Sequence, residues 1–103
     1  MGRSQKESSL KIRNQSVNVY RITLTKDSEK SFLKINQSLP AIGRRISQWI
    51  DALKTNPHLG KKLQGSDLET RWIKVGDYRV IYEVYEDQLR IVAVYIGIRG
   101  GAY

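Results

Sequence analysis

Residues 72–84, WIKVGDYRVIYEV, decide the fold of this 103-residue chain. Apolar and polar residues alternate on both sides of Gly76 and Asp77, and a two-residue connection between alternating runs is typical of an antiparallel β-hairpin. Such a turn places Lys74 directly opposite Arg79. The segment therefore predicts two neighbouring strands that hold a lysine and an arginine side by side.

The same alternation continues almost to the end of the chain and predicts a three-stranded antiparallel meander over 69–75, 78–85 and 88–96. A second two-residue turn at Glu86 and Asp87 pairs Glu83 with Arg90. One face of the predicted sheet is nearly all apolar or aromatic, and helices should cover it. That face carries Ile73, Val75, Tyr78, Val80, Tyr82, Val84, Leu89, Ile91, Ala93 and Tyr95. The opposite face is mixed, and we expect it to form a shallow groove lined by Trp72, Lys74, Arg79, Ile81, Glu83, Tyr85, Arg90, Val92 and Val94.

The first half of the chain supplies the helices. Residues 17–24 alternate and predict a strand, and the polar tetrad at 25–28 is typical of a helix start. Helical spacing follows and resumes after Pro40, which suits the first turn of a second helix. Trp49 belongs to the apolar stripe of that helix and is assigned to the core. The predicted fold is α+β in the order β-α-α-β-β-β, with a two-helix hairpin on one face of the sheet.

The composition favours a nucleic-acid partner. The chain has 18 Lys and Arg against 10 Asp and Glu, a formal net charge of +8 that attracts polyanions. Residues 1–16 are polar and lack periodicity, so we treat them as a flexible basic leader and assign residues 17–103 to one domain. With no cysteine and one histidine we expect no metal site and no cofactor. No stretch approaches the roughly 18 apolar residues of a membrane span, so we expect a cytoplasmic protein without membrane contact.

Cations gather around the predicted hairpin. Like charges in a cross-strand pair destabilise a sheet by up to about 1 kcal/mol, so the pair of Lys74 and Arg79 favours a role in which an anion lies between them. The alternative is that both side chains turn apart into water. Arg99 joins this face only if the chain bends at Gly97. The further candidates for contact with nucleic acid are Lys61, Lys62, Arg71 and Trp72.

Residues 72–84 closely resemble the hallmark of the RelE/ParE toxin superfamily, which is a basic strand, a Val-Gly-Asp-Tyr-Arg turn and an Ile-Tyr-Glu strand. The Lys-Leu-Gln-Gly stretch at 62–65 fits the family's lysine-leucine-x-glycine segment. The Ile-Gly-Ile-Arg stretch at 96–99, with Tyr103, fits its glycine-histidine-arginine-to-tyrosine segment. The resemblance covers residues 17–103 in order.

The resemblance implies a toxin of a type II toxin–antitoxin system that a cognate antitoxin neutralises. It favours the RelE-like branch, whose members cut messenger RNA on the ribosome without a metal ion and so inhibit translation. DNA is then contacted only through the antitoxin. By matching motif positions, the residues implied in catalysis are Lys74, Arg79, Arg99 and Tyr103. Arg79 and Arg99 would clamp the scissile phosphate, Lys74 would act as base or charge stabiliser, and Tyr103 would orient or stack.

Two departures from the family pattern keep alternatives open. Trp72 stands where many active members have another basic residue, and Ile98 stands where many have histidine. Trp72 could stack on a nucleobase or pack within the protein. A ParE-like inhibitor that binds DNA gyrase without chemistry has the same scaffold, as does an inactive homologue that only binds its antitoxin. The cations at Lys74, Arg79 and Arg99 favour the endoribonuclease.

Overall fold

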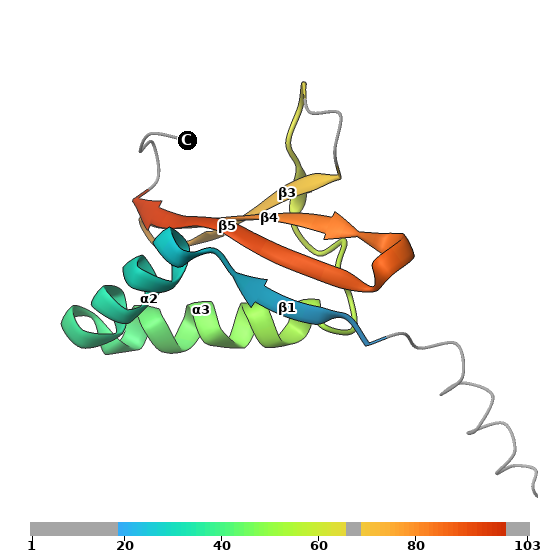
Figure 1. The fold of residues 1–103 in the computed structure, drawn as a ribbon. Coiled ribbons are helices and arrows are strands. Elements are labelled where there is room, and N and C mark those ends of the chain that lie inside the picture. Colours follow the sequence, from blue (N-terminus) through green and yellow to red (C-terminus); the bar gives the residue numbers. More distant parts are fainter. Residues whose placement is uncertain (1–18, 66–68, 99–103) are drawn as a thin grey trace, which may run out of the picture.

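Two helices pack on one face of a five-stranded sheet (Figure 1). The computed structural model describes residues 19–65 and 69–98. Its strands are β1 (Arg21–Leu24), β2 (Lys61–Lys62), β3 (Thr70–Val75), β4 (Tyr78–Tyr85) and β5 (Arg90–Ile98), and its helices are α2 (Lys26–Ser38), α3 (Pro40–Leu53) and the short 3₁₀ helix η1 (Glu86–Gln88). The predicted α+β class and the predicted position of the helices on one face are confirmed.

The strand order β1-β5-β4-β3-β2 puts the N-terminal strand beside the C-terminal one. β1 runs parallel to β5, and the other three pairs are antiparallel. β3, β4 and β5 form the predicted meander. The two-residue strand β2 lies in a segment whose sequence shows no alternation, and it pairs only through Lys61 with Trp72 and Lys62 with Arg71.

Local signals at the predicted positions fix both helix starts. Thr25 caps α2, because its hydroxyl accepts a hydrogen bond from the backbone N–H of Ser28 at 3.2 Å. Leu39 ends α2, and Pro40 occupies the first turn of α3, where its missing N–H costs nothing. The predicted two-helix hairpin is therefore confirmed.

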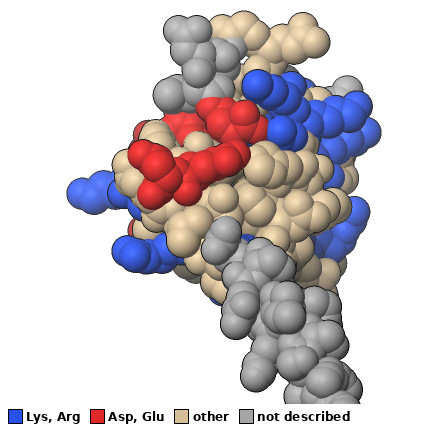
Figure 2. Space-filling view, turned by 90° about the vertical axis from the view of Figure 1, so that its right-hand side faces the viewer, with Lys and Arg blue, Asp and Glu red and all other residues tan. Residues whose placement is uncertain are grey.

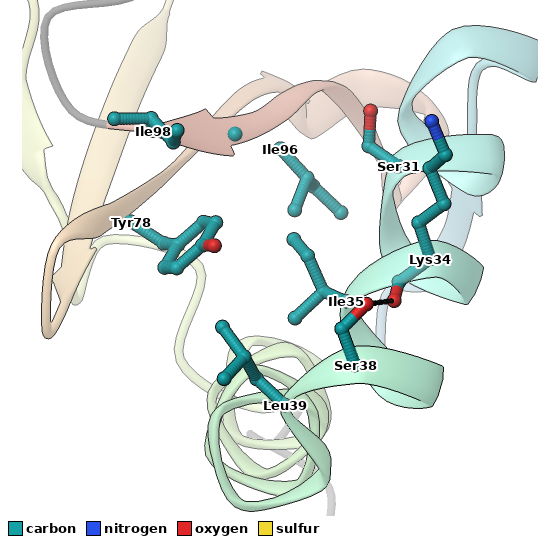
Figure 3. Close-up of a pocket in the computed structure, with 9 residues that line it drawn as sticks. Ser31, Lys34, Ile35, Ser38, Leu39, Tyr78, Ile96 and Ile98 are labelled. Atoms are coloured by element: carbon teal, nitrogen blue, oxygen red, sulfur yellow. Dashed lines mark hydrogen bonds between the residues drawn. The ribbon is translucent and has the colours of Figure 1, made fainter.

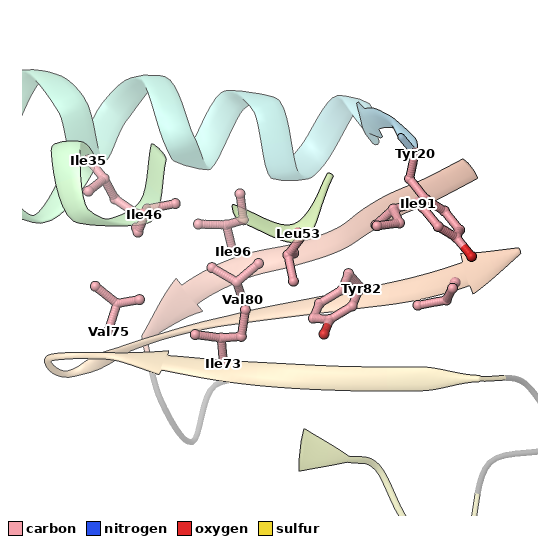
Figure 4. Close-up of a cluster of buried hydrophobic side chains, with 11 residues drawn as sticks. Tyr20, Ile35, Ile46, Leu53, Ile73, Val75, Val80, Tyr82, Ile91 and Ile96 are labelled. Atoms are coloured by element: carbon pink, nitrogen blue, oxygen red, sulfur yellow. The ribbon is translucent and has the colours of Figure 1, made fainter. Parts of the chain in front are cut away.

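The core lies between the helices and one face of the sheet (Figure 4). Ile46 and Leu53 point from α3 toward the sheet, and Ile35 does so from α2. The buried sheet residues that meet them are Ile73, Val75, Val80, Tyr82, Val84, Ile91 and Ile96. Burial of this apolar surface is the main favourable contribution to folding, at roughly 25 cal/mol per Å².

The second turn of the meander differs from the prediction. The connection between β4 and β5 has four residues, namely η1 and Leu89, whose φ of 49° lies in the left-handed region. Arg90 therefore pairs with Tyr85 and not with Glu83, which pairs with Val92. The predicted pairing of Glu83 with Arg90 is wrong, because the loop is two residues longer than a tight turn.

A β-bulge in β5 changes which residues face the helices. The register shifts between Ile81 and Tyr82, which leaves Val94 as the extra residue on β5. After the bulge Ile96 is buried in the core, whereas Tyr95 pairs with Ile81 on the opposite face. The predicted position of Tyr95 on the helix-covered face is therefore wrong. The predicted position of Leu89 on that face is also wrong, because Leu89 belongs to the four-residue connection before β5 and is exposed.

Trp49 is not a core residue, contrary to its assignment from the apolar stripe. Its side chain is 36% exposed near the end of α3. Trp49 lies at the border of the apolar stripe, whose centre is formed by Ile46, Ile50 and Leu53, and these three residues pack in the core. None of the helices in the described ranges has the length and apolar content that crossing a membrane requires.

Candidate functional site

Lys74 and Arg79 are cross-strand partners, as predicted. Both side chains lie on the face of the sheet away from the helices, because their neighbours Val75 and Val80 are fully buried in the core. Lys74 is exposed and Arg79 is half-buried. Two positive side chains therefore lie side by side in the register that the Gly76-Asp77 turn imposes.

Trp72 lies beside this pair on the same face. The Cζ atom of Arg79 is 4.6 Å from the centroid of the Trp72 ring, and the Nζ atom of Lys61 is 5.8 Å from it. Each cation–π contact contributes about 0.5–1 kcal/mol at an exposed site, which is similar to the cost of the like-charged pair. The indole therefore holds Arg79 in place without neutralising its charge.

In the part of the chain that the structure describes, no carboxylate compensates the two cations. Within residues 19–65 and 69–98, no carboxylate oxygen lies within 4.0 Å of the charged nitrogens of Lys74, Arg79 or Lys61. The Nε atom of Arg79 is buried without a hydrogen-bond partner among the described atoms. Such a group is stabilised by an anion that accepts its N–H donors.

Arg71, a candidate for nucleic-acid contact in the sequence, makes several hydrogen bonds within the protein. Its Nε donates to Glu69 at 2.5 Å, and its guanidinium also donates to the carbonyl oxygens of Gly60 at 2.7 Å and His58 at 3.3 Å. Lys62 also contacts Glu69, with its Nζ 3.6 Å from the carboxylate. The hydrogen bond from Arg71 and the nearby positive charges hold the pKa of Glu69 below its usual value. Glu69 therefore compensates the charge of both cations, which lie apart from Lys74 and Arg79.

Tyr82 fixes the loop that leads into β2. Its buried hydroxyl donates to the carbonyl of Pro57 at 2.8 Å and accepts from the N–H of Gly60 at 2.9 Å. Burial raises the pKa of this hydroxyl. A Cβ atom on Gly60 would lie 2.7 Å from both the Trp72 carbonyl oxygen and the Tyr82 hydroxyl, so only glycine fits there. The loop therefore holds Lys61 against Trp72.

Arg90, which the sequence interpretation paired with Glu83, lies instead beside Tyr85. Its Cζ lies 5.2 Å from the centroid of the Tyr85 ring, and Arg21 is its neighbour on β1. Glu83 accepts a hydrogen bond from the Tyr85 hydroxyl at 2.7 Å, which raises the pKa of that hydroxyl. This arrangement could not be predicted, because the tight-turn register paired Glu83 with Arg90.

The charges on the surface are segregated. Acidic side chains gather in one group at the end of the sheet where η1 joins β4 to β5, with lysines and arginines on either side (Figure 2). His58 lies among them, with its Nε2 2.7 Å from a carboxylate oxygen of Glu86. Lys74 and Arg79 lie at the other end of the β4 strand, so this acidic group leaves their charge uncompensated.

A hollow of about 370 Å³ opens on the helix side of the sheet (Figure 3). Tyr78, Ile96, Ile35 and Leu39 point toward one another into it, and Lys34 is the one titratable side chain besides Tyr78 that lines it. Nowhere in the described ranges do three His, Cys, Asp or Glu side chains group as they would around a metal ion. Among the described residues, Lys74, Arg79 and Lys61 form a group of neighbouring cations that makes no ion pair with a carboxylate.

We call the surface formed by Lys61, Trp72, Lys74 and Arg79 the cationic face. The sequence analysis named eight residues for catalysis or contact with nucleic acid, and the cationic face contains four of them. Lys62 and Arg71 lie outside it. Arg99 and Tyr103 lie outside the described residues, as do the leader 1–16 and the first two residues of the predicted N-terminal strand. Their assigned roles stay predictions.

Comparison with known proteins agrees with this fold. Residues 22–103 match the family model described as "ParE toxin of type II toxin-antitoxin system, parDE". The archaeal RelE of the RelE–RelB complex from Pyrococcus horikoshii is 34% identical, with a TM-score of 0.67 over 82% of this chain and 99% of that one. The isolated E. coli RelE toxin is 16% identical and has the same TM-score over 81% of this chain and 87% of its own. The Mycobacterium tuberculosis RelBE2 complex contains a chain that is 20% identical, with a TM-score of 0.65 over 79% and 99% of the two chains. No curated protein sequence matches significantly.

Proposed function

Because the chain belongs to the RelE/ParE superfamily of type II toxin–antitoxin toxins, on the RelE-like side, we propose that it is a metal-independent, ribosome-dependent endoribonuclease that cleaves messenger RNA and inhibits translation in the cytoplasm. The observation that carries this proposal is the pair of Lys74 and Arg79. Their charges have no carboxylate partner among the described residues, and a phosphodiester between them would remove the repulsion.

The proposed reaction uses Lys74 and Arg79 of the cationic face together with Arg99 and Tyr103. The ribose 2′ oxygen loses its proton and attacks the neighbouring phosphorus, and the bond to the 5′ oxygen breaks. The departing 5′ oxygen takes up a proton from water, and the products are a 2′,3′-cyclic phosphate and a 5′-hydroxyl. Arg79 holds two phosphate oxygens through its guanidinium, and Arg99 is the proposed second clamp. Lys74 removes the proton of the 2′-hydroxyl or stabilises the five-coordinate phosphate, and Tyr103 orients the chain near the leaving oxygen.

The proposed protein partner is a cognate antitoxin. The relative from P. horikoshii is solved as a complex of RelE with RelB, and that chain is covered almost completely by this one. A segment of the antitoxin that carries carboxylates would compensate the charge of Lys74 and Arg79 and block access of RNA to the cationic face. Contact with DNA would then occur only through the antitoxin.

A ParE-like inhibitor of DNA gyrase is the second candidate function. The description of the matching family model names ParE, and Trp72 is half-buried beneath Arg79 where many nucleolytic members have a basic residue. In this case the same cationic face would bind a protein surface and perform no chemistry. An inactive homologue that only binds its antitoxin is the third outcome.

In vitro translation with mapping of RNA 5′ ends separates these functions. We expect the protein to produce new 5′ ends within ribosome-bound codons. Arg79→Ala should reduce these cuts by about 10²–10³-fold. Arg44→Ala, which removes an exposed arginine from α3, is the matched control and should leave them unchanged. Intact RNA together with inhibited DNA supercoiling would identify the gyrase inhibitor instead.

A further inference from the structure

A second hollow, of about 290 Å³, adjoins the cationic face at the edge of β3. We call it the edge hollow. It lies where β2 begins, since Lys61 is the first residue of β2 and pairs with Trp72. Its walls come from the end of α3, the loop before β2 and the middle of β3, and the residues that line it are Trp49, Leu59, Gly60, Lys61, Trp72, Ile73 and Lys74.

Large apolar side chains are exposed in the edge hollow. Trp49 is 36% exposed and Leu59 is 42% exposed, although both could have been polar at no cost to the core. The ring of Trp72 is already in contact with Arg79 and Lys61. The free apolar surface is therefore supplied mainly by Trp49 and Leu59, and an indole face is the kind of surface on which nucleobases stack.

Two lysines line the same hollow. Lys61 and Lys74 are both exposed, and neither has a carboxylate partner within the described ranges. Lys74 also belongs to the pair that would hold the scissile phosphate. A ligand in the edge hollow would thus meet an aromatic surface on one side and positive charge on the other, continuous with the cationic face.

The hollow is preformed. Leu59 and Lys61 flank Gly60, whose N–H is held by the Tyr82 hydroxyl and whose carbonyl is held by Arg71. The same hydroxyl holds the carbonyl of Pro57, which is buried. A wall fixed on both sides loses little conformational entropy when a ligand binds.

We propose that the edge hollow binds one nucleotide of the RNA strand next to the scissile phosphate, with its base against Trp49 and Leu59 and its phosphate toward Lys61 and Lys74. This inference rests on the proposed endoribonuclease function and names a subsite for it. The volume is just below the roughly 300 Å³ at which pockets for small ligands begin, so it suits a single base and no larger aromatic group.

The test uses the two tryptophans, which are the only ones in the chain and both line the hollow. Trp72→Phe leaves Trp49 as the sole source of tryptophan fluorescence. This variant is titrated at low salt with a single-stranded 2′-O-methyl RNA octamer, which has no 2′-hydroxyl to attack and stays intact. Low salt is chosen because phosphate contacts weaken steeply as salt increases. We expect saturable quenching of Trp49, and no such quenching by an octamer that has the same phosphates without bases.

Affinity measurements on the same octamer give a second readout. Trp49→Ala should weaken binding by about 5- to 100-fold, and Trp49→Phe should restore most of it, because a base stacks on any aromatic ring. Leu59→Ala should weaken binding by a few fold. Leu33→Ala removes a similarly exposed leucine from α2 and should have no effect.

The outcomes separate this subsite from the proposed function. If the octamer binds and Arg79→Ala weakens it while Trp49 fluorescence stays unchanged, the subsite is wrong and the endoribonuclease proposal stands. If the octamer does not bind at low salt, the subsite is also wrong, and the mapping of RNA 5′ ends decides the function independently. If an acidic antitoxin peptide quenches Trp49 and the octamer does not, the edge hollow belongs to the antitoxin interface and the inference is overturned.

Discussion

Lys74 and Arg79 are directly opposite each other on β3 and β4, and no carboxylate among the described residues lies within 4.0 Å of either charge. The Gly76-Asp77 turn fixes this pairing, because the φ of 61° at Gly76 suits a tight hairpin turn. The arrangement costs stability in the free protein. Such a pair of like charges is expected at a site that binds an anion, because the anion offsets their repulsion.

Removal of Lys74 should therefore stabilise the protein while it lowers activity. We expect Lys74→Ala to raise the free energy of unfolding by up to about 1 kcal/mol at low salt, because it relieves repulsion of Arg79. The gain should shrink at 1 M salt, where the Debye length is about 3 Å. Urea unfolding at two salt concentrations measures both effects. Lys30→Ala, an exposed lysine on α2, is the control, and an equal gain in that variant would contradict the explanation.

Lys74→Arg separates the two proposed roles of this lysine. Arginine keeps the positive charge and does not lose its proton, so it can stabilise the five-coordinate phosphate but cannot act as the base. If Lys74 is the base, the single-turnover rate of RNA cleavage should fall by about 10²–10⁴-fold. A rate within a few fold of the wild type would assign Lys74 to charge stabilisation alone.

Tyr82→Phe should destabilise the fold and loosen the loop beside the edge hollow. The variant leaves the Gly60 N–H and the Pro57 carbonyl without their partner, at a cost of about 1–3 kcal/mol. Tyr85→Phe is the matched control, since its hydroxyl contacts a surface carboxylate, and it should cost less than about 1 kcal/mol. Denaturant unfolding compares the two. Equal costs would show that the buried hydroxyl does not fix the loop.

Glu69 should make part of the stability depend on pH. The hydrogen bond from Arg71 lowers the pKa of Glu69 below its usual 4.5, so the unfolded chain takes up this proton more readily than the folded one. The stabilisation is present above pH 4.5 and is lost as the pH falls through the lowered pKa.

The difference in unfolding free energy between the wild type and Glu69→Gln reports this effect. We expect about 1–3 kcal/mol at pH 7, because the substitution removes the acceptor of a charged hydrogen bond, and a smaller difference below pH 4.5. Measurement by urea unfolding from pH 3 to pH 7 gives the profile. A difference that stays constant over this range would contradict the role of the carboxylate.

The part of the fold that local chemistry determines could be predicted from the sequence. Thr25 caps a helix, Pro40 begins one and Gly76 forms a tight turn because each residue type suits one local backbone conformation. The pairing of Lys74 with Arg79 follows from that turn alone. For this reason the central pair of the candidate site could be predicted from the sequence alone.

The rest of the fold depends on features that no short stretch of the sequence indicates. Leucine disfavours a positive φ, so nothing in the sequence marks Leu89 as the end of a four-residue connection. The bulge at Val94 and the parallel position of β1 beside β5 arise from packing of the whole sheet. Helical periodicity assigns Trp49 to the apolar stripe of α3 but does not show that its side chain lies at the exposed border of that stripe.

The most direct test of the central claim is a double-mutant cycle on RNA binding. Affinity for the uncleavable 2′-O-methyl octamer is measured for the wild type, Lys74→Ala, Arg79→Ala and the double variant at low salt, with Arg44→Ala as control. If both side chains hold the same phosphate, we expect each single variant to weaken binding and the two effects to be non-additive by at least about 0.5 kcal/mol. Strictly additive effects, or losses no larger than that of Arg44→Ala, would contradict a shared anion between Lys74 and Arg79.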